Sequence, residues 1–383
     1  MKRIVLILFI SSMLVVCSAC EAIKAQSTKP IITPSESQTQ ESDPLAVNLS
    51  EIPLYEVLGL SEAEQVLILD VSEDRLLINV YTDYTQDNPQ FKEEGYNSVT
   101  KELKIYDTSE DRIVMSLKMP DGVFCTDASF LGDAFAYVTV SPTKDAPAKY
   151  NIEVYDGTTT SIITSGECLE TGYDEPQVEA LGDTQFAYSF YDYETNMFGV
   201  NVSSTQGEIT PQISLVDDGS TEHLRTTLCG NGAEYIYYAA VKSKGTIFVG
   251  NADNLTHQFV LPQTERIYEF CFLENRILFT MEKSDANSTK KEIVIKDYEG
   301  NNLLARECEA LYRLKSNGKD TVLGIDGKYT AYLVHVSDDE ISSQIIDVES
   351  APVQFNCLND NTFLLHYYRG NNEGHLRLLR LTI

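Results

Sequence analysis

The fold is decided by a stretch that reads Arg266-Ile-Tyr-Glu-Phe-Cys-Phe-Leu273, Asn275-Arg-Ile-Leu-Phe-Thr-Met281, Lys291-Glu-Ile-Val-Ile-Lys-Asp297 and Asn302-Leu-Leu-Ala-Arg-Glu307. Each run is short, rich in β-branched, aromatic and other apolar residues, and bounded by polar turn residues. We therefore expect four consecutive strands, here called a to d. The chain shows no sustained helical period.

This four-strand unit recurs along the chain. Its a–b turn returns as Leu131-Gly-Asp, Leu181-Gly-Asp, Leu273-Glu-Asn and Leu358-Asn-Asp. Strand a begins near Glu64, Gly122, Pro176, His223, Arg266, Leu311 and Val353. Four strands per repeat of about 40 to 50 residues are typical of propeller blades. The sequence thus predicts an all-β fold, a seven-bladed β-propeller of four-stranded antiparallel blades; the alternative is a pair of β-sandwich domains. The repeats resemble bacterial propeller repeats in general and match no specific propeller family.

The last unit is one strand short. Its strands a, b and c are expected at Pro352–Leu358, Thr362–Tyr368 and His375–Ile383, and no strand d follows. A spare strand at Ser50–Leu58 precedes the first unit and can close the ring, which would otherwise expose two sheet edges. We expect the segment around Leu54 to pair with Leu376–Leu381.

The first residues predict export. Lys2 and Arg3 precede the apolar run Ile4–Val16, which is shorter than the roughly 20 residues that a membrane-spanning helix needs. Residues 1–19 therefore have the character of a secretory signal peptide. Ser18-Ala19-Cys20 resembles the lipobox of bacterial lipoproteins. The resemblance implies that Cys20 carries a diacylglycerol; the alternative is an ordinary cleaved signal with a coincidental Cys.

Three regions follow from these patterns. Residues 1–19 are the predicted lipoprotein signal peptide, residues 20–48 the lipidated Cys and a Ser/Thr/Pro/Gln-rich linker, and residues 49–383 the propeller. The linker composition is too polar to bury a core of its own, so it serves as a tether. We expect a protein anchored by lipid on the extracytoplasmic side of a bacterial membrane.

The net charge of −29 limits the partners. Acidic residues are spread along the chain, so nucleic acid is excluded as a partner and contact with the membrane is expected through the lipid anchor only. We expect a monomer with an unidentified protein or peptide partner. Six Cys remain beyond Cys20 without close spacing, and most are expected to be free buried thiols: Cys125, Cys168, Cys229, Cys271, Cys308 and Cys357.

Long connections mark one face of the predicted disc. The b–c and d–a connections emerge together on that face, and in the first three units they exceed the minimum length. Loops on a rigid scaffold commonly carry recognition residues, and Tyr combines an apolar ring with a polar tip. The predicted partner-binding residues are Tyr84, Phe91, Tyr96, Tyr173, Asp174, Tyr191, Asp192 and Tyr193.

Catalytic and metal-site motifs are missing from the sequence, so we predict no catalytic residue, no metal site and no cofactor. The expected function is a membrane-anchored extracellular binding or scaffold protein that recognises a protein or peptide through the b–c/d–a loop face of the first three blades. The alternative is an extracellular hydrolase or lyase that acts on glycans or peptides at the propeller channel.

Overall fold

The computed structural model describes residues 46–83, 98–141, 147–168, 175–217, 225–241, 244–284, 288–348, 352, 354–367 and 377–383. The chain divides into two units, Met1–Pro44 and Leu45–Ile383, and all described residues belong to the second. The predicted signal peptide and Cys20 lie outside the described residues. Within the described part, no helix is long and apolar enough to cross a membrane.

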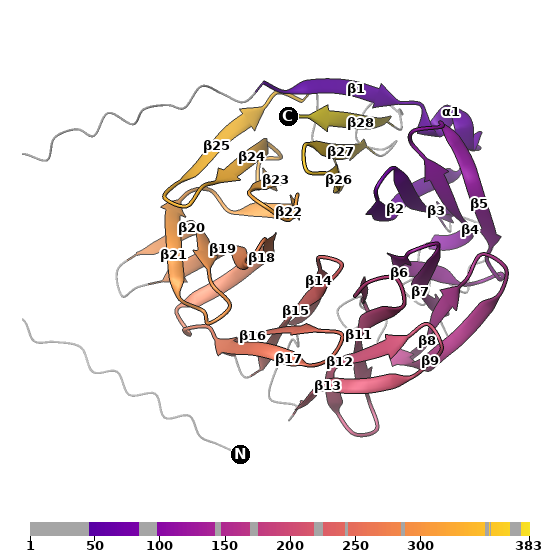
Figure 1. Cartoon of the computed structure of the whole chain (residues 1–383), viewed down its shortest axis with the longest axis horizontal. Coiled ribbons are helices and arrows are strands. Elements are labelled where there is room, and N and C mark those ends of the chain that lie inside the picture. Colours follow the sequence, from indigo (N-terminus) through magenta and orange to yellow (C-terminus); the bar gives the residue numbers. More distant parts are fainter. Residues whose placement is uncertain are drawn as a thin grey trace, which may run out of the picture. The chain divides into compact units, whose positions relative to one another are not determined.

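Seven four-stranded antiparallel sheets stand in a ring around a central channel, so the predicted β-propeller is confirmed (Figure 1). Blades 1 to 3 are β2 (Glu64–Ser72), β3 (Arg75–Asp83), β4 (Ser98–Asp107) and β5 (Arg112–Lys118); β6 (Phe124–Leu131), β7 (Ala134–Ser141), β8 (Ala148–Tyr155) and β9 (Thr160–Cys168); and β10 (Val178–Ala180), β11 (Gln185–Asp192), β12 (Met197–Ser204) and β13 (Ile209–Val216).

Blades 4 to 7 continue in the same order. They are β14 (Arg225–Gly230), β15 (Glu234–Val241), β16 (Lys244–Asn251) and β17 (Leu255–Val260); β18 (Glu265–Leu273), β19 (Arg276–Ser284), β20 (Thr289–Lys296) and β21 (Asn302–Glu307); β22 (Leu311–Ser316), β23 (Thr321–Asp326), β24 (Ala331–Val336) and β25 (Ile341–Ile346); and β26 (Gln354–Asn359), β27 (Thr362–Tyr367), β28 (Arg377–Thr382) and β1 (Asn48–Ile52).

The hydrophobic core lies between neighbouring blades. One cluster joins Val138 and Ile152 of blade 2 to Val178 and Phe186 of blade 3. Every residue of β23 and β27 is buried, because the second strand of a blade is covered on both faces. The outermost strand β5 instead alternates between exposed and half-buried residues. This gradient explains why the inner strands have near-continuous apolar sequences and the outer strands alternate.

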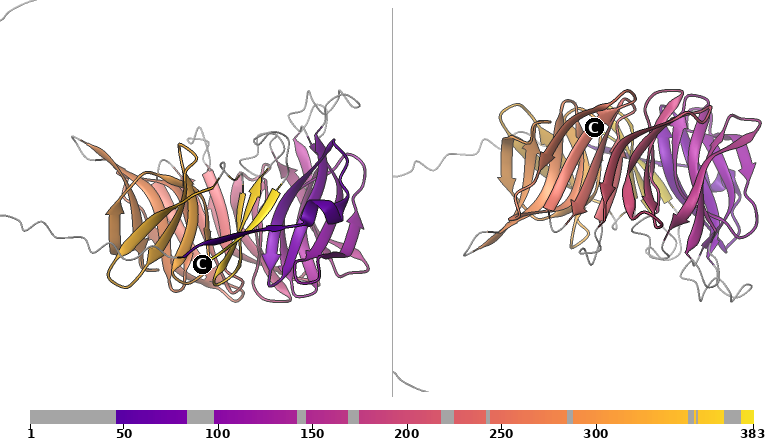
Figure 2. Two further views of the ribbon diagram at one scale, coloured as in Figure 1. Left: turned by 90° about the horizontal axis from the view of Figure 1, so that it is seen from above. Right: turned by 90° about the horizontal axis from the view of Figure 1, so that it is seen from below.

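The ring closes as predicted, through an N-terminal strand in the last blade. β1 pairs antiparallel with β28 from Asn48–Thr382 to Ile52–Leu378, as the outermost strand of blade 7. Figure 2 shows the disc from its edge, with β1 in indigo crossing beside the yellow C-terminal strands. Chain segments from both ends of the domain therefore build one sheet.

The expectation that this strand extends to Leu58 is wrong. After Pro53 the chain forms the short helix α1 (Leu54–Leu58), which ends at Gly59 in the left-handed conformation with φ 59°. Leu54 does not pair with β28; its side chain is fully buried in a cluster with Ile68 of blade 1 and Leu378 of blade 7. The helix thus fills the seam between the first and last blades.

Candidate functional site: the central channel

The channel is lined by the innermost strand of every blade. These strands are β2, β6, β10, β14, β18, β22 and β26, and each lies beside the next around the ring. A cavity of about 520 Å³ is lined by residues along these strands, and its lining reaches Gln177 just before β10 and Gln354 at the start of β26. Its position places it toward the b–c/d–a face. A second cavity of about 420 Å³ adjoins it and is lined by residues of the a–b turns, including Gly232 and Gly318.

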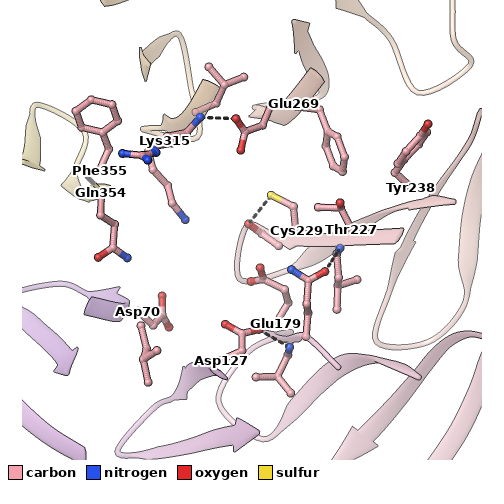
Figure 3. Close-up of a pocket in the computed structure, with 18 of the residues that line it drawn as sticks. Asp70, Asp127, Glu179, Thr227, Cys229, Tyr238, Glu269, Lys315, Gln354 and Phe355 are labelled. Atoms are coloured by element: carbon pink, nitrogen blue, oxygen red, sulfur yellow. Dashed lines mark hydrogen bonds between the residues drawn. The ribbon is translucent and has the colours of Figure 1, made fainter. Parts of the chain in front are cut away.

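At least one charged or polar side chain from each blade lines the larger cavity (Figure 3). In blade order, they include Asp70, Asp127, Glu179, Cys229, Glu269, Lys315 and Gln354. Three of the carboxylates directly follow a β-bulge, between Ile68 and Asp70, Cys125 and Asp127, and Ile267 and Glu269. A bulge changes the direction of the side chains after it, so the irregularities direct the carboxylates to the channel.

These side chains also join each blade to the next. The Phe130 amide of blade 2 donates to Asp70 Oδ2 at 2.8 Å, and the Val178 amide of blade 3 donates to Asp127 Oδ2 at 2.8 Å. The innermost strand of a blade is a sheet edge whose N–H groups need acceptors, because no further strand pairs with it. The channel acids therefore support the ring as well as giving the channel its charge.

The same cross-blade contact recurs at other blades. Gln177 Oε1 accepts from the Leu228 amide at 2.8 Å, and Glu269 accepts a hydrogen bond from the Arg313 amide. At the seam between blades 7 and 1, the amide of Gln354 donates to the Ile68 carbonyl oxygen and its Oε1 accepts from the Ile68 amide at 3.3 Å. Acceptors from one blade thus satisfy the edge of the next at several points around the channel.

A buried histidine lies behind the seam. His366 of β27 is fully buried, with Nδ1 3.3 Å from Gln354 Oε1 and its ring stacked 6.0 Å from that of Tyr55 on α1. Burial lowers the pKa of His366 to about 3, so the imidazole is neutral at physiological pH. It serves as an uncharged hydrogen-bonding group that helps to orient Gln354.

The carboxylates hold protons more tightly than free side chains. Burial raises the pKa of Asp127 to about 7 and that of Glu179 to about 8, and the charges of neighbouring channel carboxylates add to both increases. Burial also raises the pKa of Asp70 and of Glu269, although backbone hydrogen bonds oppose the change. The channel therefore exchanges protons close to neutral pH.

Two cations come from blade 6. β22 is irregular between Tyr312 and Lys315, and Arg313 has φ 56°, a left-handed conformation that costs energy for a residue with a side chain. Burial lowers the pKa of Lys315, but the surrounding negative groups outweigh it and the net pKa is raised, so its ammonium stays charged. Arg313 Nη1 donates to the Pro352 carbonyl at 3.2 Å, and both side chains line the larger cavity.

Unlike charges face each other across the channel. In a ring of seven, blade 6 lies opposite blades 2 and 3, and Figure 3 shows Lys315 across the cavity from Asp127 and Glu179. We call Asp70, Asp127 and Glu179 the acidic wall and Arg313 and Lys315 the basic wall. Tyr238, Ile267 and Phe270 add an apolar side to the same cavity, with the rings of Tyr238 and Phe270 6.3 Å apart.

This site offers neither a reactive thiol nor a cluster of metal-binding side chains among the described residues. Burial and the charge of Glu179 raise the pKa of the Cys229 thiol to about 12, so it is protonated and weakly nucleophilic at neutral pH. The six Cys of the domain are free thiols, and Cys125, Cys168 and Cys271 are buried. Across the described residues, no group of three or more His, Cys, Asp or Glu side chains is arranged to hold a metal ion.

Comparisons with known proteins find similarity of fold but no similarity of sequence that shows a family. No family model and no curated protein matches the sequence. Among solved structures, the chain is similar to Raptor from Chaetomium thermophilum (TM-score 0.50, 9% identity, 82% of this chain and 27% of that chain) and to hydrazine synthase from Kuenenia stuttgartiensis (0.50, 9%, 81% and 94%). The β-propeller domain of the Trilobed protease from Pyrococcus furiosus aligns at TM-score 0.48 and 13% identity over 65% of this chain and 80% of that chain.

The similarities to Raptor and to hydrazine synthase are similarities of fold alone. The chain spans about a quarter of the length of the Raptor chain, and identities near 10% carry no information on activity.

The loop residues predicted to bind a partner are only partly described. Tyr84, Phe91, Tyr96, Tyr173 and Asp174 lie outside the described residues. Tyr191, Asp192 and Tyr193 lie together at the b–c turn of blade 3, all half-buried.

Part of this turn is structural. The Tyr191 and Tyr193 rings lie 4.5 Å apart, and Tyr191 donates to Asp217 Oδ2 at 3.2 Å. Asp192 Oδ1 accepts from the Glu194 amide at 2.9 Å and Oδ2 from the Thr195 hydroxyl at 2.6 Å; the hydroxyl bond is the main cause of its lowered pKa. Asp192 therefore stabilises the turn that presents the two tyrosines.

The channel residues were not among the residues predicted from the sequence. One signal was present: Asp127 and Glu269 each lie four positions before the Leu of the a–b turn in their own repeats, Leu131 and Leu273. An acidic residue at one repeat position of an inner, apolar strand indicates a channel-facing position.

Proposed function

We propose that this protein is a membrane-anchored extracellular binding or scaffold protein that recognises a protein or peptide through its b–c/d–a face. The observation that carries the proposal is the charged cavity toward this face, whose carboxylates are held in place by backbone hydrogen bonds from the next blade. Groups fixed in this way are pre-organised, so binding orders few side chains. The half-buried tyrosine pair of blade 3, Tyr191 and Tyr193, lies at the b–c turn of the same face.

The anchor is the part of the proposal that sequence alone supports. Replacing Cys20 by alanine is expected to move the protein from the membrane fraction to the soluble fraction, because the acyl chains supply the membrane affinity. The neighbouring Cys17→Ala variant is the matched control and should remain with the membrane. Fractionation and immunoblotting give the answer; a Cys20→Ala protein that still sediments with membranes would show that Cys20 is not the anchor.

The recognition face can be tested by site-specific cross-linking. A photo-reactive amino acid at Tyr193, in the b–c turn of blade 3, is expected to cross-link a protein partner on the native cell surface. The same group at Asp183, in the a–b turn of that blade, samples the opposite face. Mass spectrometry of the adducts identifies the partner. Equal adducts from both positions, or from Asp183 only, would contradict the proposed face.

Catalysis is a second candidate for one reason. Asp127 and Glu179 have pKa values of about 7 and 8, so either can donate a proton at neutral pH, as a hydrolase or lyase requires. Turnover of a glycan or peptide panel by the full chain, lost in Asp127→Asn, would favour this alternative. Binding without turnover would favour the non-catalytic function.

A further inference from the structure

We infer that the channel binds a ligand that carries a cationic group and a carboxylate together, namely a basic amino acid or the basic C-terminal residue of a peptide. This inference rests on the proposed binding function, because it names the class of ligand that the binding face recognises. It is carried by the geometry of the larger cavity, in which an acidic wall and a basic wall stand opposite each other.

Within the part of the chain that the structure describes, no direct ion pair joins the two walls. Among the residues that the structure describes, the ion pairs found do not include Lys315, although this ammonium lies in the field of Asp70, Asp127 and Glu179. Oppositely charged groups enclosed by one ring of strands would gain from direct contact, but a cavity of about 520 Å³ separates them. That volume lies within the range of small-molecule sites.

The charges select the ligand class. A simple cation entering the cavity is attracted by the acidic wall but repelled by Arg313 and Lys315. A simple anion meets the basic wall but is repelled by the carboxylates. A ligand with both charges places its cation against Asp127 and Glu179 and its carboxylate against Lys315, so each group meets its opposite. Such a ligand bridges the gap that the protein leaves open.

The apolar side of the cavity favours a long basic side chain. Tyr238, Ile267 and Phe270 line the cavity between the charged walls. The methylene stem of arginine or lysine can pack against these groups while its charged end reaches a carboxylate. Four carboxyl groups line the cavity, from Asp70, Asp127, Glu179 and Glu269, against the two cations Arg313 and Lys315. A bound cation favours the ionised form of these groups, so a ligand with an additional positive charge suits the site better than a neutral zwitterion.

Protonation supplies a second readout. The pKa of Glu179 is raised to about 8 and that of Asp127 to about 7 in the free protein. A bound cation favours the ionised carboxylates, so binding should release protons at pH 7 and become tighter as the pH rises toward 8. Calorimetry in two buffers with different ionisation enthalpies measures this release.

The test compares three ligands on the purified full chain. L-Arginine carries all the proposed groups, N-acetyl-L-arginine represents the C-terminal residue of a peptide, and agmatine is arginine without its carboxylate. We expect L-arginine or N-acetyl-L-arginine to bind at least about tenfold more tightly than agmatine, because a charge-assisted contact to Lys315 is lost in agmatine. Tight binding by both shows that a free α-ammonium is not needed, and binding by L-arginine alone indicates a free amino acid.

Two variants make the result specific. Lys315→Met should reduce the preference for L-arginine over agmatine to about twofold or less, since the partner of the carboxylate is gone. Lys328→Met removes an exposed lysine of the same blade outside the cavity and should retain the preference. Circular dichroism and thermal melting confirm that both variants are folded, and Glu179→Gln should weaken L-arginine and agmatine alike.

The inference is overturned if none of the three ligands binds at millimolar concentration, if agmatine binds as tightly as L-arginine, or if Lys315→Met keeps the full preference. These results would not contradict recognition of a protein partner, because cross-linking at Tyr193 tests that proposal separately. Conversely, ligand binding without any cross-linked partner would remove the proposed function and keep the channel site.

Discussion

Deletion of Leu49–Leu58 from the full chain is expected to destabilise all seven blades together. The deletion removes most of β1, which pairs along its whole length with β28, and the buried Ile52 and Leu54. Burying such a side chain contributes about 1.5–3 kcal/mol, and an unpaired β28 edge adds to the loss. Because a domain is stable by only about 5–15 kcal/mol, most of the stability of the ring should disappear.

Thermal and urea unfolding measure this effect, and two substitutions separate packing from strand pairing. Leu54→Ala empties a fully buried position between blades 1 and 7 and should lower the free energy of unfolding by about 2–5 kcal/mol. Val57→Ala on the same helix is the control; Val57 is 38% exposed, so the change should be below about 0.5 kcal/mol. A deletion variant that melts like the intact protein would contradict closure through β1.

The second large effect is a gain in stability at alkaline pH when Glu179 is replaced by glutamine. The pKa of Glu179 is about 8 in the folded protein against an ordinary value of 4.5, so the native state binds more protons than the unfolded chain between these values. The contribution of this group is therefore fully present below about pH 4.5 and is lost as the pH rises through 8. Glutamine removes the charge and retains an acceptor oxygen.

We expect Glu179→Gln to raise the free energy of unfolding by about 1–2 kcal/mol at pH 9, reduced from the full linkage value because the side chain is half-buried and lines an open channel. At pH 5 the change should be close to zero. Glu208→Gln is the matched control: the same blade loses the same charge, at an exposed position outside the channel. Chemical denaturation at several pH values measures the free energy of unfolding of the unsubstituted protein, Glu179→Gln and Glu208→Gln. If both substitutions raised this free energy equally at pH 9, charge repulsion in the channel would not be the cause.

The architecture could be predicted because each blade repeats a local pattern. Inner strands such as β23 are buried throughout, whereas outer strands such as β5 alternate between exposed and half-buried residues. Both patterns can be recognised from the spacing of apolar residues in the sequence. The need for a fourth strand in blade 7 followed from counting strands. The confirmed parts of the fold thus depend on strand periodicity and on the number of repeats.

The helix at Leu54–Leu58 was missed for a physical reason. Five residues are too few for a periodic pattern, and β-branched Val57 fits a strand as well as a helix. Pro53 before the segment and Gly59 after it were the available signals, since proline is favoured at helix starts and glycine just past helix ends. Burial of Leu54 in the seam then stabilises a helix that local sequence alone would not hold.

The channel could not be assembled from sequence because its residues come from seven repeats. Whether Asp127 or Glu269 faces the channel depends on a bulge in its strand, and a bulge breaks the alternation on which such predictions depend. The raised pKa values require the other blades to be in place. The sequence instead pointed to the loops, where Tyr191, Asp192 and Tyr193 lie at the predicted b–c turn.

The shared sheet of blade 7 also determines the order of events during biosynthesis. Of the described strands, β1 leaves the ribosome first, whereas β28, its partner in the sheet that the structure describes, emerges last. Until then Asn48–Ile52 must stay unpaired while the six intervening blades form, and the long-range contact should make final closure a slow step. A chain stalled before Arg377 would expose one edge of β27, which makes incomplete products targets for aggregation or proteolysis.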